Sequence, residues 1–159
     1  MCVDLRSMEY YEVEEVVLNL GEKKYRAKQI YNFLAKGVSS IDEMYTLSKD
    51  FREKLKERYY ICKTDIYHKL ESNLDGTRKY LIELGDGNLI ETVLMIYKNG
   101  PSICLSTQVG CRMGCKFCAS TIGGKVRDLH YSEMIAQVIL LNKDNGGNGK
   151  NKVIKNIVL

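Results

Sequence analysis

Apolar residues in the first third of the chain recur at the i, i+3, i+4 spacing of amphipathic helices. Two such faces end at a glycine suited to a helix terminus; they comprise Val13, Val16, Val17 and Leu20 before Gly21, and Ala27, Ile30, Tyr31 and Leu34 before Gly37. Ser40 and Glu43 have the spacing of a capping box that would open a short helix over residues 41–45. Ser48 is a candidate cap for a further helix. The pattern predicts a helical module over residues 1–62.

After residue 62 the pattern changes to that of β-strands. Three stretches rich in apolar and β-branched residues fit strands: Ile66–Leu70, Lys79–Leu84 and Leu89–Ile96. The dipeptides Asp75-Gly76 and Asp86-Gly87 lie between them, and Asp-Gly is a strong signal for a tight hairpin turn. We therefore expect a β-hairpin region over residues 63–100, which leads into the last part of the chain.

Residues 101–159 have the pattern of a strand, a loop, a helix and a second strand. Ile103–Thr107 fits the first strand, Ser132 is a candidate helix cap, and residues 153–159 fit the second strand. This order predicts one βαβ unit, so the fold class is α/β with an added helical module. Because the final residues are apolar, we expect the α/β domain to continue beyond Leu159 and this chain to be truncated.

The composition is typical of a globular protein, with 45% hydrophobic and 28% charged residues. The sequence has no apolar run of the roughly 18 residues that a membrane span requires. Its beginning also lacks the apolar core of a signal peptide. We therefore expect a cytoplasmic protein. In that compartment thiols stay reduced, and clustered cysteines indicate metal binding or catalysis more often than disulfides.

Charge is unevenly distributed within the net value of +4. Residues 1–19 hold one basic and five acidic side chains, residues 20–80 hold fourteen and nine, and residues 100–159 hold eight and three. A basic middle and C-terminal part suits a nucleic-acid backbone. Charge alone is at least as consistent with a solvated, lysine-rich surface.

Cys111, Cys115 and Cys118 form a C-x₃-C-x₂-C motif. A structural zinc site requires four ligands, and a cluster held entirely by protein requires four cysteines. Three cysteines therefore indicate a cluster with one open coordination position. Three alternatives stay open on spacing alone: buried structural cysteines, a disulfide scaffold, and a zinc site completed by a remote ligand such as His130 or Cys104.

With Phe117 just before its last cysteine, the motif resembles the signature of the radical S-adenosylmethionine enzymes. The resemblance implies that Cys111, Cys115 and Cys118 bind three irons of a [4Fe–4S] cluster and that S-adenosylmethionine chelates the fourth iron. It implies that Phe117 lies near the adenine of that cofactor. It also implies that residues 101–159 begin a partial (β/α)₆ barrel. The open position would then be the reactive one.

The sequence around the motif is more specific. Glu91–Cys111, Cys115–Leu129, Ser132–Gln137 and the helical run Leu20–Tyr31 are very similar to the dual-specificity ribosomal and transfer RNA adenine methyltransferases. The resemblance extends over nearly the whole chain. It implies methylation of carbon 2 of an adenosine in 23S rRNA and of another in the tRNA anticodon loop. It also implies that the helical module binds RNA.

The resemblance gives roles to two further residues. Cys104 matches a resolving cysteine, which attacks a thioether between protein and RNA and releases the methylated product. Glu91 matches a proposed proton acceptor. Without the resemblance, Cys104 would be a buried strand cysteine and Glu91 a solvent-facing strand residue. The family's methyl-carrying cysteine and its glycine-glutamate-proline segment do not occur in this sequence. We therefore expect the chain to be inactive by itself.

The resemblance also implies the partners: 23S rRNA, tRNA and an electron donor such as flavodoxin or ferredoxin. Two other functions stay open. One is that of the related enzymes that methylate carbon 8 of the same ribosomal adenosine and confer antibiotic resistance. The other is a non-enzymatic, zinc-binding RNA module.

Overall fold

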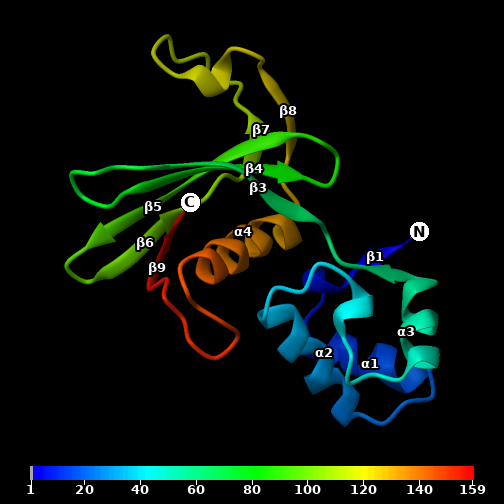
Figure 1. The fold of residues 1–159 in the computed structure, drawn as a ribbon. Coiled ribbons are helices and arrows are strands. Elements are labelled where there is room, and N and C mark those ends of the chain that lie inside the picture. Colours follow the sequence, from blue (N-terminus) through cyan, green and yellow to red (C-terminus); the bar gives the residue numbers. More distant parts are fainter. Residues whose placement is uncertain (1) are drawn as a thin grey trace.

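The computed structural model describes residues 2–159, so Met1 of the predicted module lies outside the described residues. Helices occupy the N-terminal part and a mixed sheet with one long helix occupies the rest, which confirms the predicted α/β class (Figure 1). The buried apolar residues form two separate clusters, one within residues 5–61 and one within residues 80–141. Among the helices described over residues 2–159, none has both the length and the apolar character that a membrane span requires.

The N-terminal part contains three α-helices: α1 (Tyr10–Asn19), α2 (Tyr25–Ala35) and α3 (Lys49–Lys56). The two predicted apolar faces lie on α1 and α2 and supply buried residues to the first cluster. The Ser48 hydroxyl caps α3 as predicted, accepting a hydrogen bond from the Phe51 amide at 3.3 Å. The capping box predicted at Ser40 does not form, because the Ser40 side chain accepts no capping hydrogen bond from the backbone. Instead, the Glu43 carboxylate accepts from the Ser39 amide at 2.8 Å, and the segment is a short 3₁₀ turn, Ile41–Glu43.

A parallel strand pair closes this part of the chain, and the sequence pattern did not predict it. β1 (Val3–Asp4) pairs with β2 (Tyr59–Tyr60). Each strand has only two residues, which is too short to give an alternating pattern. The pair brings the two ends of the segment together around the first core cluster.

The main sheet has five strands in the order β3-β4-β5-β6-β9. Their bounds are β3 (Thr64–Glu71), β4 (Arg78–Leu84), β5 (Leu89–Tyr97), β6 (Gly100–Cys104) and β9 (Asn156–Val158). β3 to β6 are antiparallel hairpins, whereas β6 and β9 run parallel. Gly76 and Gly87 adopt positive φ angles of 71° and 80° in the two predicted turns, which is a conformation that suits glycine.

Helix α4 (Tyr131–Asp144) connects β6 to β9 and completes the predicted βαβ unit. It lies between the sheet and the helical part and covers one face of the sheet (Figure 1). Alternate residues of β5, namely Ile90, Thr92 and Leu94, are buried toward it. Within residues 2–159 no helix covers the opposite face, which is called the open face below.

Two expectations for this region are corrected. The helix begins after His130 and not at Ser132, because the Glu133 carboxylate accepts from the His130 amide at 2.9 Å while Ser132 is buried in the first turn. The strand expected over 103–107 is β6, which ends at Cys104. The Leu105 amide still donates to the Val158 carbonyl of β9, but the next two residues leave the sheet. The Ser106 backbone bonds to the Gln137 side chain of α4, and the Thr107 carbonyl accepts from the Leu129 amide.

Candidate functional site

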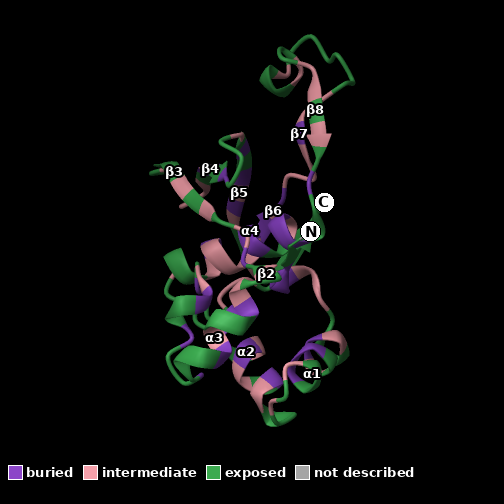
Figure 2. Ribbon diagram, turned by 90° about the vertical axis from the view of Figure 1, so that its right-hand side faces the viewer, coloured by how far each residue is buried: buried purple, intermediate pink, exposed green. Residues whose placement is uncertain are grey.

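The clustered cysteines lie on an arm that projects from the sheet (Figure 1). β7 (Gln108–Gly110) and β8 (Lys125–Asp128) form an antiparallel pair, and the loop between them carries the C-x₃-C-x₂-C motif. Residues 108–128 are called the cysteine arm below. Its outer loop is largely exposed, whereas buried residues concentrate in the sheet, α4 and the helical part (Figure 2).

The two ends of the cysteine-bearing loop meet at Gly110 and Gly124, a contact called the neck of the arm below. Gly110 has a φ of +70°, and a Cβ atom placed on it would lie 1.9 Å from the carbonyl oxygen of Gly124. Next to this contact, the Cys111 amide donates to the same Gly124 carbonyl at 3.1 Å. A side chain at position 110 would therefore have to displace the backbone that joins the two ends of the loop.

The three cysteines are held on a short, hydrogen-bonded turn. The Cys118 amide donates to the Cys115 carbonyl at 3.0 Å, and the Thr121 hydroxyl donates to the Cys118 carbonyl at 2.8 Å. All are free thiols; Cys115 is exposed and the other two are half-buried. Three thiolates are a donor set that suits iron–sulfur clusters as well as zinc. Within residues 2–159, however, no three His, Cys, Asp or Glu side chains converge as a metal site, and this includes His130 and Cys104.

The tip of the arm also exposes large apolar side chains. Phe117, the predicted neighbour of the cofactor adenine, is 94% exposed, and Met113 and Ile122 of the same loop are also exposed. Several large apolar side chains exposed on one loop make it a candidate contact surface. The geometry leaves Phe117 free to contact a ligand.

Glu91 and Cys104 lie on the open face. Because side chains alternate along β5, Glu91 and Val93 point away from α4. Cys104 is paired with Val93 in the β5–β6 ladder and so shares that face. Glu91 and Cys104 are therefore diagonal neighbours, a relation that corresponds to about 7–8 Å across an antiparallel pair. β5 is a central strand of the sheet. Glu91 therefore does not lie on an edge strand, where an acidic residue is more usual.

Contacts around Glu91 link this face to the arm. The Lys79 ammonium of β4 lies 2.5 Å from the Glu91 carboxylate, and the Ser106 hydroxyl donates to the Glu91 carbonyl at 2.5 Å. Glu91 and Ser106 line a hollow together with Gly110 and Ala119 of the cysteine arm. The structure thus brings the predicted proton acceptor to the base of the cysteine arm. Cys104 does not line this hollow.

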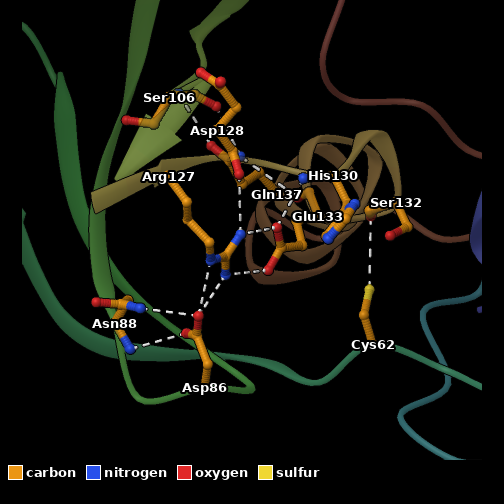
Figure 3. Close-up of polar contacts among 10 residues, drawn as sticks. All are labelled: Cys62, Asp86, Asn88, Ser106, Arg127, Asp128, His130, Ser132, Glu133 and Gln137. Atoms are coloured by element: carbon orange, nitrogen blue, oxygen red, sulfur yellow. Dashed lines mark hydrogen bonds and ion pairs between the residues drawn. The ribbon is translucent and has the colours of Figure 1, made fainter. Parts of the chain in front are cut away.

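A polar network at the base of the arm was not predicted as part of the site. Arg127 of β8 pairs with Asp86 and Glu133, and Gln137 of α4 bonds to the backbone of Ser106 (Figure 3). Arg127 and Gln137 lie within the segments that resemble the family, but the resemblance gives neither residue a role. Helical spacing does not distinguish a buried Gln from an exposed one, so the sequence carried no signal for these contacts.

The charges in this network stabilise one another. Partial burial would raise the pKa of Asp86, but hydrogen bonds from Asn88 and Arg127 outweigh it and lower that pKa to about 2. Burial likewise opposes ionisation of Glu133, but the hydrogen bonds that its carboxylate accepts from Arg127 and His130 lower its pKa. Both carboxylates therefore stay charged opposite the Arg127 guanidinium at neutral pH.

Cys62 contrasts with the cysteines of the arm. Burial, reinforced by Asp4, raises the pKa of its thiol to about 11. Its Sγ lies 3.6 Å from the Ser132 carbonyl, where the helical part meets α4 (Figure 3). A half-buried thiol whose pKa is raised in this way is not a ready metal ligand or nucleophile.

Comparisons with known proteins identify the family of this chain. Residues 3–61 match the family model of the ribosomal RNA large subunit methyltransferase N-terminal domain. The chain is 50% identical over 157 residues to the probable dual-specificity RNA methyltransferase RlmN of Alkaliphilus oremlandii, and 48% identical over 157 residues to that of Alkaliphilus metalliredigens. These matches span 99% of this chain but only 44% and 43% of the relatives.

A solved structure shows the same fold. The crystal structure of a radical SAM methyltransferase from Sphaerobacter thermophilus superimposes with a TM-score of 0.82 at 33% sequence identity, covering 99% of this chain and 46% of that one. The chain thus spans less than half the length of its relatives. On these matches it belongs to the RlmN family of RNA methyltransferases and corresponds to a part of its members.

Proposed function

We propose that this chain is part of a radical S-adenosylmethionine RNA methyltransferase that methylates carbon 2 of an adenosine in 23S rRNA and in tRNA. One observation carries the proposal: Glu91 and the cysteine arm line the same hollow, and Cys104 lies on the same open face as Glu91. Three groups with separate predicted roles thus lie on one side of the sheet. Membership in the RlmN family supports the substrate class.

In this proposal Cys111, Cys115 and Cys118 would hold a [4Fe–4S] cluster, and Phe117 would contact S-adenosylmethionine. When bound, the cluster would supply the electron for reductive cleavage of S-adenosylmethionine. The closed neck at Gly110 and the turn after Cys115 fix the backbone that carries the ligands. The exposed ring of Phe117 is available to pack against the adenine.

Glu91 and Cys104 perform the proton and thiol steps. The Glu91 carboxylate accepts the proton from the carbon that receives the methyl group, and Lys79 holds that carboxylate in place on the open face. The Cys104 thiolate attacks the sulfur of the thioether that joins protein and RNA. An S–S bond forms between Cys104 and the methyl-carrying cysteine as the S–C bond breaks, and the electron pair stays with the carbon, which takes up a proton and becomes the methyl group of the released base. Their diagonal relation on one face of the sheet supports action on one bound nucleotide.

We assign residues 1–62 to RNA binding, residues 63–100 to the hairpins that lead to the open face, and residues 101–159 to the start of the barrel. The first part has its own core cluster and coincides with the matched family model. The protein would work in the cytoplasm with a flavodoxin or ferredoxin as electron donor.

If phosphate contacts dominate, the affinity of the chain for rRNA fragments, followed by fluorescence anisotropy, will fall steeply as salt rises. Affinity independent of salt would contradict RNA docking on a basic surface.

Anaerobic reconstitution of the full chain with iron and sulfide tests the cluster. We expect about four irons and four sulfides per chain, together with an EPR signal of the reduced cluster that changes when S-adenosylmethionine is added. The Cys115→Ser variant should lose the cluster, whereas Cys2→Ser, which alters an exposed cysteine outside the arm, should keep it. Stoichiometric zinc without a cluster would instead favour a zinc-binding RNA module.

A further inference from the structure

The cysteine arm is joined to the rest of the molecule at its base. Val109 of β7 and Leu129, which directly follows β8, are buried in the second core cluster. The Leu129 amide donates to the Thr107 carbonyl at 2.9 Å. These contacts anchor the base, but apolar contact is not directional and does not by itself set the angle of a two-stranded ribbon.

A buried glutamine holds the first strand of the base. Gln137 has no exposed surface, and its amide nitrogen donates to the Ser106 carbonyl at 3.1 Å. Its amide oxygen accepts from the Ser106 amide at 3.1 Å and from the Thr92 hydroxyl at 2.7 Å. One side chain of α4 thus fixes the backbone before β7 and the central strand β5.

An arginine holds the second strand. The Arg127 guanidinium donates to both carboxylate oxygens of Glu133, at 2.7 and 2.8 Å. Through Nε and Nη2 it also donates to Asp86, at 2.9 and 2.6 Å (Figure 3). Asp86 belongs to the β4–β5 turn and Glu133 to the first turn of α4, so three elements meet at one side chain. The planar, bidentate geometry fixes direction as well as distance.

Position along the arm makes this contact consequential. Arg127 lies on β8, three residues after Gly124 at the neck of the arm. Asp86, which Arg127 binds, belongs to the turn that leads directly into β5. This is the strand that carries Glu91. Arg127 therefore connects the strand that ends the cysteine loop with the strand that carries the predicted proton acceptor.

We propose that Arg127 is a positioning residue: through Asp86 and Glu133 it fixes the angle of the cysteine arm to the open face, and with it the placement of the three thiols relative to Glu91 and Cys104. The catalytic meaning of this placement rests on the proposed function. The orientation itself does not depend on any bound group.

The chain offers a matched control on the same strand. Lys125 pairs with Asp128, three residues along, at 2.7 Å. Both partners belong to the arm, so this ion pair cannot orient it. Lys125→Met removes a surface charge from β8 as Arg127→Met does, but leaves the contacts to the β4–β5 turn and α4 intact.

Residual dipolar couplings of the metal-free chain measure the orientation. We expect the β7 and β8 amides of the Lys125→Met variant to fit the same alignment as the main sheet, as in the unaltered chain. In Arg127→Met they should deviate from that alignment or be averaged, while β3–β5 stay unchanged. Asp86→Asn should produce a smaller deviation, and Arg127→Lys should restore part of the order, because lysine keeps the charge but not the fork.

The reconstituted protein gives the second readout. We expect Arg127→Met to bind S-adenosylmethionine about 10–100-fold more weakly, the range found for residues that orient metal ligands, with a shifted EPR spectrum. Lys125→Met should match the unaltered chain in both. An unchanged arm orientation in folded Arg127→Met would overturn the inference. Failure of the unaltered chain to form a cluster would instead remove the proposed function, and the orientation measurement would still stand.

Discussion

The helical part and the cysteine arm are held together by different forces. The helical part is built around apolar side chains of α1, α2 and α3, many of them fully buried. Within the arm only Val109, at its base, is buried, and in our proposal the orientation of the arm depends on polar contacts such as those of Arg127. Many interchangeable apolar contacts tolerate local change, whereas a few directional bonds do not. The helical part is therefore suited to be a rigid support, whereas the cysteine arm is suited to hold its loop in one defined orientation.

The largest expected change in stability comes from the loss of a large core side chain in the helical part. Phe51 of α3 is fully buried, and Phe51→Ala should lower the free energy of unfolding by about 3–5 kcal/mol. Urea unfolding followed by circular dichroism measures this. Tyr11→Ala, at an exposed position of α1, is the control and should change stability little. Equal losses in both variants would contradict a core centred on Phe51.

A methyl group at the neck should disrupt the arm. Gly110→Ala introduces the strain of a positive φ angle, about 1–2 kcal/mol, and in addition a clash with the Gly124 carbonyl. Gly87→Ala has the same strain, with φ at +80°, but its Cβ meets nothing within 4 Å. We expect fast amide exchange at Cys111 in the first variant only. Similar exchange in both would show that strain, and not close approach, requires the glycine.

Removal of the Gln137 amide should loosen the base of the arm. Gln137→Met keeps the volume but leaves the Ser106 backbone and the Thr92 hydroxyl without their partner. We expect a loss of about 1–3 kcal/mol in stability, with faster exchange at the Ser106 amide. Exchange in α1 should not change. Uniform acceleration throughout the chain would show that Gln137 supports the whole fold and not the arm in particular.

Acid should release the Arg127 contact by a small amount. The pKa of Asp86 is lowered from 3.8 to about 2 in the folded chain. Its charged form therefore adds stability above pH 3.8, and that contribution is lost as the pH falls through about 2. Since Asp86 is partly exposed, solvent weakens the effect. The NMR signal of the Arg127 Nε proton should shift over this range, and Asp86→Asn should remove the Asp86 part of that shift.

Several elements could be predicted from the sequence because their cause is local. The apolar faces of α1 and α2, the Ser48 cap and the Asp-Gly turns each depend on residues within one or two turns of chain. The predicted start of α4 failed for a related reason. Ser132 and His130 both precede the apolar face, and the Glu133 carboxylate bonds back to the His130 amide.

The remaining errors concern short or long-range features. β1, β2, β7 and β8 have two to four residues each, too few for an alternating pattern. Their pairing depends on partners far away in sequence. The same is true of Arg127, whose partner Asp86 lies 41 residues earlier. Nothing in its local sequence indicates which carboxylate it will meet.

By itself, the sequence determined the chemistry available to this protein: three thiols on one loop, a further cysteine at the end of a strand and a glutamate in an apolar strand. It also determined the order of helices and strands, because hydrophobic periodicity is a local property. Only the tertiary structure decided that Glu91 and Cys104 share the open face and that the arm's base lies beside Glu91. Strand register and long-range ion pairs settle such placement, and both form only when distant segments pack together.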